Sequence, residues 1–187
     1  MMTIAGQPFL TDFQTQQLIS QFQQKTKLNV SQITTQQVYV LSREVEGDEH
    51  KKALDLLAVD SATVLAAPKA NQLQVIVGPR FGTISPWASK ATDIFNNCEI
   101  AINRVERVIV YTLTIDGKID GEASASNKLP PAAEQLLFDR MTQSLVYDLS
   151  DVSKLFDDQE PASLNHIDVI GQGQSALESA NTEFGFA

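Results

Sequence analysis

Five polar side chains that could contact an anion lie within one short stretch of the sequence. Residues 78–93 read Gly-Pro-Arg-Phe-Gly-Thr-Ile-Ser-Pro-Trp-Ala-Ser-Lys-Ala-Thr-Asp. An alternating, β-branched segment at 73–77 precedes them and predicts a half-buried strand, and apolar residues at helical spacing follow. A helix N-terminus presents free N–H groups and partial positive charge, so this junction suits a phosphate, a carboxylate or an acidic partner surface. The candidate contact residues are Arg80, Thr83, Ser85, Ser89 and Lys90.

The start of the predicted helix has its own signals. Ser85 is of the type that caps a helix, and Pro86 suits the first helical position. Trp87 falls on the apolar stripe, so we expect it to point inward and anchor the helix. An ordinary strand-to-helix loop with a capping serine also fits these residues, and the geometry alone favours that simpler interpretation.

No catalytic constellation is recognisable elsewhere in the sequence. Cys98 has no Cys–His pairing pattern and is expected to be a structural thiol. His50 and His166 lack a second ligand at metal-binding spacing, so both are expected to be solvated surface residues. The segment at 78–82 lacks the spacing and the Gly-Lys-Ser/Thr ending of a phosphate-binding loop. We therefore predict no catalytic residue and no metal site.

Composition and charge argue against a nucleic-acid-binding protein and against a membrane-spanning one. The chain has 187 residues, 43% of them hydrophobic, one cysteine and a net charge of −9. Residues 69–107 carry five basic and three acidic side chains, whereas residues 108–187 carry four and 13. No basic stripe exists to neutralise phosphates, so nucleic-acid binding is disfavoured, and no apolar run is long enough for a membrane span. A single cysteine excludes an internal disulfide, and these features together favour a cytoplasmic location.

A charged pair lies at the start of the longest predicted strand, which covers about 104–115. Arg104 and Glu106 fall on one face of that strand because side chains alternate. We expect them to form a surface ion pair, which contributes little to stability.

The order of predicted elements indicates an α+β fold. It is β-α-β-α-β for about residues 1–67 and again for about 72–149, which suggests two similar halves, although no side-chain identity links them. The first half includes a predicted strand at 62–66, and a polar loop is predicted at 116–127. We assign residues 1–149 to one domain.

The remaining residues, 150–187, differ in character. They predict short helices, and an apolar stripe through Leu177, Ala180 and Phe184 has no partner in the chain. We interpret 150–187 as a helical linker cut from a longer protein.

The stretch 83–93, continued by Ile94-Phe-Asn-Asn-Cys98 and Asn103-Arg-Val-Glu-Arg107, resembles the N-terminal region of the large, single-chain phosphoribosylformylglycinamidine synthases. These are the glutamine-dependent amidotransferases of purine biosynthesis. The resemblance runs from the opening helix to the segment at 171–181, and Phe81 stands where the family pattern has a second proline. In that family this region is similar to a fused pair of a small accessory subunit.

The resemblance implies a non-catalytic structural domain of a larger enzyme. That enzyme uses ATP, with magnesium, and glutamine to convert formylglycinamide ribonucleotide to the amidine, in a synthetase domain and a glutaminase domain. The region matched is expected to hold no cofactor itself, to brace those two domains and to shelter ammonia between them. Two alternatives remain open, namely a free-standing regulatory or ligand-binding module and an anion-binding enzyme that uses Arg80, Ser85 and Lys90.

Overall fold

A computed structural model describes residues 1–26, 28–59, 65, 67–116, 128–157 and 164–184. The chain forms two compact units, Met1–Asp157 and Asp158–Ala187.

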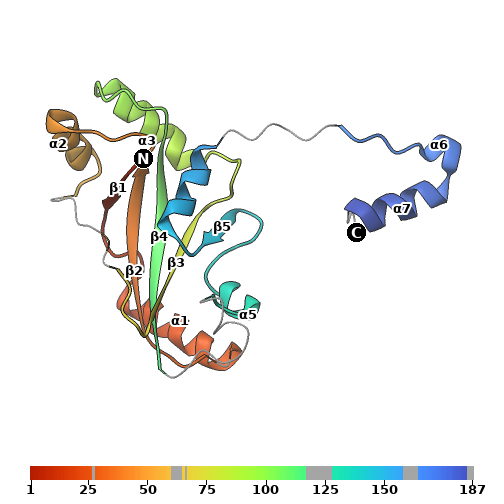
Figure 1. The fold of residues 1–187 in the computed structure, drawn as a ribbon, viewed down its shortest axis with the longest axis horizontal. Helices are drawn as coiled ribbons and strands as arrows, with labels where there is room; N and C mark the ends of the chain where they lie inside the picture. The colour runs from red at the N-terminus through yellow and green to blue at the C-terminus, as the bar shows by residue number, and fades with distance from the viewer. Residues whose placement is uncertain (27, 60–64, 66, 117–127, 158–163, 185–187) are drawn as a thin grey trace. The chain divides into compact units, whose positions relative to one another are not determined.

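The first unit is built on one five-stranded sheet (Figure 1). The strand order is β1-β2-β4-β3-β5, and every neighbouring pair is antiparallel. Two long strands form its centre, since β2 and β4 pair from Val30↔Ile115 to Leu41↔Val105. The elements of this unit are β1 (Met2–Ala5), α1 (Asp12–Lys25), β2 (Val30–Leu41), α2 (Gly47–Leu56), β3 (Gln72–Pro79), α3 (Pro86–Asn97), β4 (Val105–Ile115), α5 (Pro131–Glu134), β5 (Gln143–Val146) and the 3-10 helix η1 (Leu149–Phe156).

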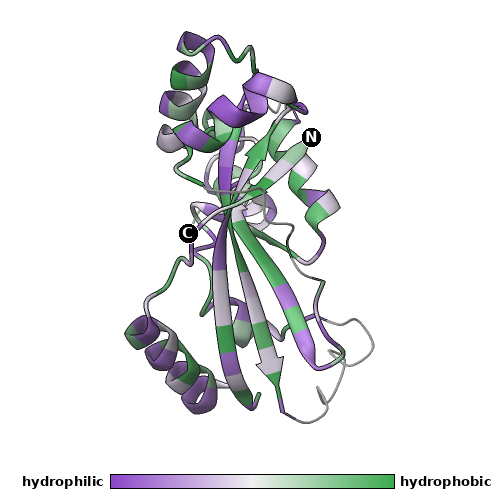
Figure 2. Cartoon of the chain, turned by 90° about the vertical axis from the view of Figure 1, so that its left-hand side faces the viewer, coloured by the Kyte–Doolittle hydropathy of each residue, from purple (hydrophilic) through white to green (hydrophobic). Residues whose placement is uncertain are grey.

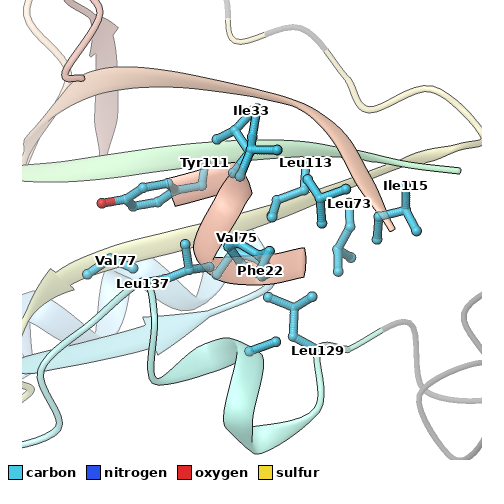
Figure 3. Packing of buried hydrophobic residues seen from close by; sticks show 13 residues of the cluster. Phe22, Ile33, Leu73, Val75, Val77, Tyr111, Leu113, Ile115, Leu129 and Leu137 are labelled. Atoms are coloured by element: carbon cyan, nitrogen blue, oxygen red, sulfur yellow. The ribbon is translucent and has the colours of Figure 1, made fainter. Parts of the chain in front are cut away.

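Helices cover one face of the sheet at both of its ends. This face carries the odd-numbered residues of β4, because side chains alternate along a strand. At one end α1 and α5 close an apolar cluster, in which Phe22 of α1 and Leu137 converge on strand residues such as Val75 (Figure 3). At the other end α2 and α3 cover a second cluster, which includes Phe95 and Val105. Figure 1 shows these helix pairs near opposite ends of the long strands.

The other face of the sheet is divided into an apolar half and a polar half. Val108 and Val110 of β4 pack against Val152 and Leu155 of η1. Gly78 allows this close packing, because a Cβ there would lie 2.9 Å from a Val108 methyl group. The polar half carries uncharged polar side chains that are at least partly exposed. Figure 2 shows hydrophilic segments along the strands of the sheet. The residues of the polar half are Gln32, Thr34, Gln36, Gln72, Gln74, Thr112 and Thr114.

The predicted α+β class is confirmed, whereas the predicted duplication is not. Both predicted halves contribute strands to one sheet, β1 and β2 from the first half and β4, β3 and β5 from the second. The predicted strand at 62–66 and the predicted loop at 116–127 lie largely outside the described residues. After Pro130 the chain forms only a single helical turn, α5, and Met141 beyond it is exposed.

The boundary of the first unit lies later than the predicted residue 149. The unit continues through η1 to Asp157, because Val152 and Leu155 are buried against the sheet. The apolar positions of η1 therefore belong to the first core and not to the linker.

The second unit contains two helices, α6 (Val169–Gln172) and α7 (Gln174–Phe184). Ala176 and Ala180 of α7 are buried, whereas Leu164 and Ile170 are exposed. In the described part of the chain, no helix is long and apolar enough to cross a membrane.

Candidate functional site

The junction between β3 and α3 holds the predicted contact residues. Ser85 is the N-cap of α3, as predicted, since its Oγ accepts a hydrogen bond from the Ala88 N–H at 3.0 Å. Pro86 occupies the first turn. Gly82 has a φ of +76°, a left-handed conformation that favours glycine, and this allows the tight turn after β3.

A buried carboxylate lies directly beneath this helix start. The Glu106 side chain is fully buried, and its two oxygens accept four hydrogen bonds. Ser85 donates two of them, from its N–H at 3.2 Å and from its hydroxyl at 3.0 Å. The Arg107 N–H donates the third at 3.3 Å, and the guanidinium of Arg104 donates the fourth at 2.6 Å. The carboxylate is therefore well satisfied despite its burial.

Arg104 extends this contact to two further segments. Its Nη1 donates to the Leu155 carbonyl in η1 at 2.6 Å, and its Nη2 donates to the Thr83 carbonyl in the loop at 2.6 Å. Only 14% of the Arg104 side chain is exposed. We call Ser85, Arg104 and Glu106 the inner clamp, because together they hold the loop, α3, β4 and η1.

The predicted surface ion pair is thus wrong for Arg104 and Glu106. Both side chains lie on the sheet face that η1 covers, so the pair is removed from water. Breaking a buried pair leaves an uncompensated charge inside the protein, which costs about 3–5 kcal/mol. The pair is therefore an important constraint on the junction.

The inner clamp also changes what the helix N-terminus can bind. The Glu106 carboxylate supplies negative charge where an external anion would be attracted. The Ser85 hydroxyl is occupied by Glu106 and Ala88. An anion-binding enzyme that uses Ser85 with Arg80 and Lys90 is therefore disfavoured.

The other predicted contact residues lie on the outside of the junction. Arg80, Thr83, Ser89 and Lys90 are all exposed, whereas Ser85 is half-buried. The Thr83 hydroxyl donates to the Arg80 carbonyl at 2.6 Å, which closes the turn. One guanidinium N–H of Arg80 reaches the Met141 carbonyl at 3.4 Å. The structure therefore divides the five residues between an inner and an outer side.

Trp87 packs the start of α3 against the sheet. Its ring is half-buried and stacks on Tyr39 of β2, with 5.7 Å between the ring centroids. The guanidinium of Arg107 lies 5.2 Å from the Trp87 ring centroid, which is within the range of a cation–π contact. The indole therefore fixes the first turn of α3 against β2 and β4.

Reasoning from the sequence missed Glu106 as the centre of the junction. A usable signal existed, because Glu106 alternates with Val108 and Val110 and so falls on an apolar strand face. A carboxylate on such a face needs a partner, and Arg104 on the same face is the obvious one. The hydrogen bonds from Ser85 depend on where α3 starts in space, which no local pattern contains.

Other candidate groups add no chemistry to this site. Cys98 is half-buried, and His50 is half-buried rather than fully solvated. His166 is exposed. Among the described residues, no group of three or more His, Cys, Asp or Glu side chains could hold a metal ion.

A comparison with protein families finds a match that covers this junction. The model of the formylglycinamide ribonucleotide amidotransferase N-terminal region matches residues 36–156, which is more than half of the chain. The matched region starts in β2, includes the whole inner clamp and ends with η1. This chain belongs to the family of formylglycinamide ribonucleotide amidotransferase N-terminal domains.

Proposed function

We propose that this chain is a non-catalytic structural domain of a phosphoribosylformylglycinamidine synthase. In this proposal it braces the synthetase and glutaminase domains of the same polypeptide and helps to shelter ammonia between them. The full enzyme would use ATP, magnesium and glutamine to amidate formylglycinamide ribonucleotide. The observation that carries the proposal is the family match over residues 36–156.

The inner clamp supports a bracing role. A domain that positions others must hold its contact surface rigidly, and Arg104 joins the loop at Thr83 to η1 at Leu155 through 2.6 Å hydrogen bonds. Its charge is neutralised by Glu106 inside the protein, so the clamp needs no external ligand.

The outer side of the junction is the contact surface that we propose for the synthetase domain. Arg80, Thr83, Ser89 and Lys90 are exposed there, and Arg80 and Lys90 form no ion pair with the described residues. These two cations suit an acidic or phosphate-bearing surface, where docking would shield the charges from water. Ammonia must travel between sites without escaping or being protonated, so a closely packed neighbouring domain has a clear use.

Two assays test this proposal. The isolated chain should neither hydrolyse ATP nor release ammonia from glutamine, and turnover well above that of a boiled sample would contradict it. In the full-length enzyme, Glu106→Gln should loosen the junction and increase the glutamine hydrolysed per amidine formed, with the ammonia-dependent reaction less affected. Equal losses in both reactions would instead indicate a general folding defect, and no loss in either would contradict a bracing role.

A further inference from the structure

A large apolar side chain lies exposed on the outer side of the junction. Ile84 is 64% exposed and belongs to none of the apolar clusters formed by the described residues. It directly precedes the N-cap Ser85, a position whose apolar side chain often packs against the fourth residue of the helix. That fourth residue is Ser89, which is polar and exposed. Ile84 therefore lacks the apolar partner that its position usually has.

The inner clamp holds the backbone on both sides of Ile84. The Thr83 carbonyl accepts a hydrogen bond from Arg104 at 2.6 Å, and the Ser85 N–H donates to Glu106 at 3.2 Å. A side chain on a backbone that is already fixed loses less conformational freedom when it binds. An exposed aliphatic side chain on such a backbone is well suited to anchor an interface.

A second exposed apolar side chain lies next to the same turn. Met141 is 74% exposed, and its carbonyl accepts a hydrogen bond from the Arg80 guanidinium at 3.4 Å. The Arg80 N–H donates to the Thr142 carbonyl at 3.0 Å, and the Arg80 carbonyl accepts from the Thr83 N–H at 3.1 Å. Arg80 therefore joins the segment of Met141 to the turn that leads into Ile84.

The charged groups around these two apolar side chains are mainly basic. Residues 80–92 and 140–147 contain no acidic side chain, and Asp93 and Asp139 lie at their margins. A partner surface with acidic groups would complement this surface, whereas a basic one would be repelled. Three exposed cations here form no ion pair with the described residues, namely Arg80, Lys90 and Arg140.

We propose that Ile84, with Met141 beside it, is the apolar anchor by which this chain docks on the synthetase domain. The anchor enters an apolar pocket of that domain whose rim carries Asp or Glu side chains, and these pair with Arg80, Lys90 and Arg140. This inference rests on the proposed function, which names the synthetase domain as the partner. It adds that burial of Ile84 holds the two domains together, while the cations set their orientation.

Substitutions at Ile84 in the full-length enzyme test both the anchor and the charge of its pocket. Ile84→Ala should increase the glutamine hydrolysed per amidine formed by about fivefold or more, because an interface anchor is lost. Ile84→Asp should have a larger effect than Ile84→Lys, because an acidic rim repels a carboxylate and attracts an ammonium group. Equal effects of Ile84→Asp and Ile84→Lys would overturn the proposal of an acidic rim.

Two controls separate a docking defect from a folding defect. In the isolated chain, the Ile84 variants should unfold at nearly the wild-type urea concentration, because the side chain is largely exposed. In the full-length enzyme, Phe13→Asp should leave the coupling unchanged. Phe13 is 78% exposed on α1, which lies near the opposite end of the long strands from α3 (Figure 1).

Photo-crosslinking in the full-length enzyme identifies the surface that Ile84 contacts. The photoreactive residue p-benzoylphenylalanine replaces Ile84, and the crosslinked peptides are identified by mass spectrometry. We expect peptides of the synthetase domain that contain Asp or Glu. Crosslinks confined to the glutaminase domain or to a second copy of the enzyme would overturn the proposal.

The combined Arg80→Ala and Lys90→Ala variant distinguishes failure of this inference from failure of the proposed function. If the combined variant weakens the coupling and Ile84→Ala does not, the anchor is wrong and the proposed docking surface stands. If neither weakens the coupling, the proposed function fails and the anchor fails with it.

Discussion

The two sides of the junction between β3 and α3 use polar residues in opposite ways. On the inner side, Ser85, Arg104 and Glu106 bond to one another and to the backbone, and Glu106 is fully buried. On the outer side, Ser89 and Lys90 are exposed one turn along the same helix. Polar side chains in one short stretch can therefore either fix the fold or remain available to a partner. Residue type alone does not distinguish these two uses, whereas burial does.

The largest effect is expected when the buried negative charge of the inner clamp is removed. Glu106→Gln keeps the shape of the side chain but leaves the Arg104 guanidinium without its counter-charge in a buried place. The free energy of unfolding of the chain should fall by about 3–5 kcal/mol, measured by urea denaturation. Glu46→Gln is the control, because Glu46 is exposed and makes no capping bond. A loss similar to that of the control would show that the inner clamp is not structural.

A second test removes the Trp87 ring, which packs the start of α3 against the sheet. Trp87→Ala should lower the free energy of unfolding by roughly 2 kcal/mol, less than a full core truncation, because the ring is only half-buried. Loss of the stack on Tyr39 and of the Arg107 contact contributes to this effect. Ile84→Ala is the comparison, since Ile84 is 64% exposed and should have little effect. Equal effects of the two substitutions would mean that Trp87 does not anchor the helix.

A smaller effect is expected when only the cap is removed. Ser85→Ala deletes the hydroxyl that bonds Ala88 and Glu106, so stability should fall by about 1–2 kcal/mol. Ser89→Ala removes a hydroxyl from the exposed side of the same helix and should change little. A double-mutant cycle between Ser85→Ala and Glu106→Gln should show that the two effects are not additive. Full additivity would contradict a shared network.

The sequence predicted the local elements of this molecule better than their assembly. Alternation identified β3 and β4, and Ser85 with Pro86 marked the start of α3 within a residue. The strand order was not predictable, because β4 pairs with β2 across a long sequence separation that no local pattern encodes. For the same reason the sequence placed Arg104 and Glu106 on one strand face but not inside the protein. The burial of that pair depends on η1, which was assigned to the linker.

The smallest effect on the isolated chain is the most direct test of the proposed function. Arg80→Ala combined with Lys90→Ala should change the free energy of unfolding of the chain by less than about 0.5 kcal/mol, because both side chains are exposed. In the full-length enzyme, the same pair should increase the glutamine hydrolysed per amidine formed, because the outer surface would no longer dock correctly. We expect an unchanged fold and weaker coupling of glutamine hydrolysis to amidine formation. Unchanged coupling in the full-length double variant, with the fold intact, would contradict it.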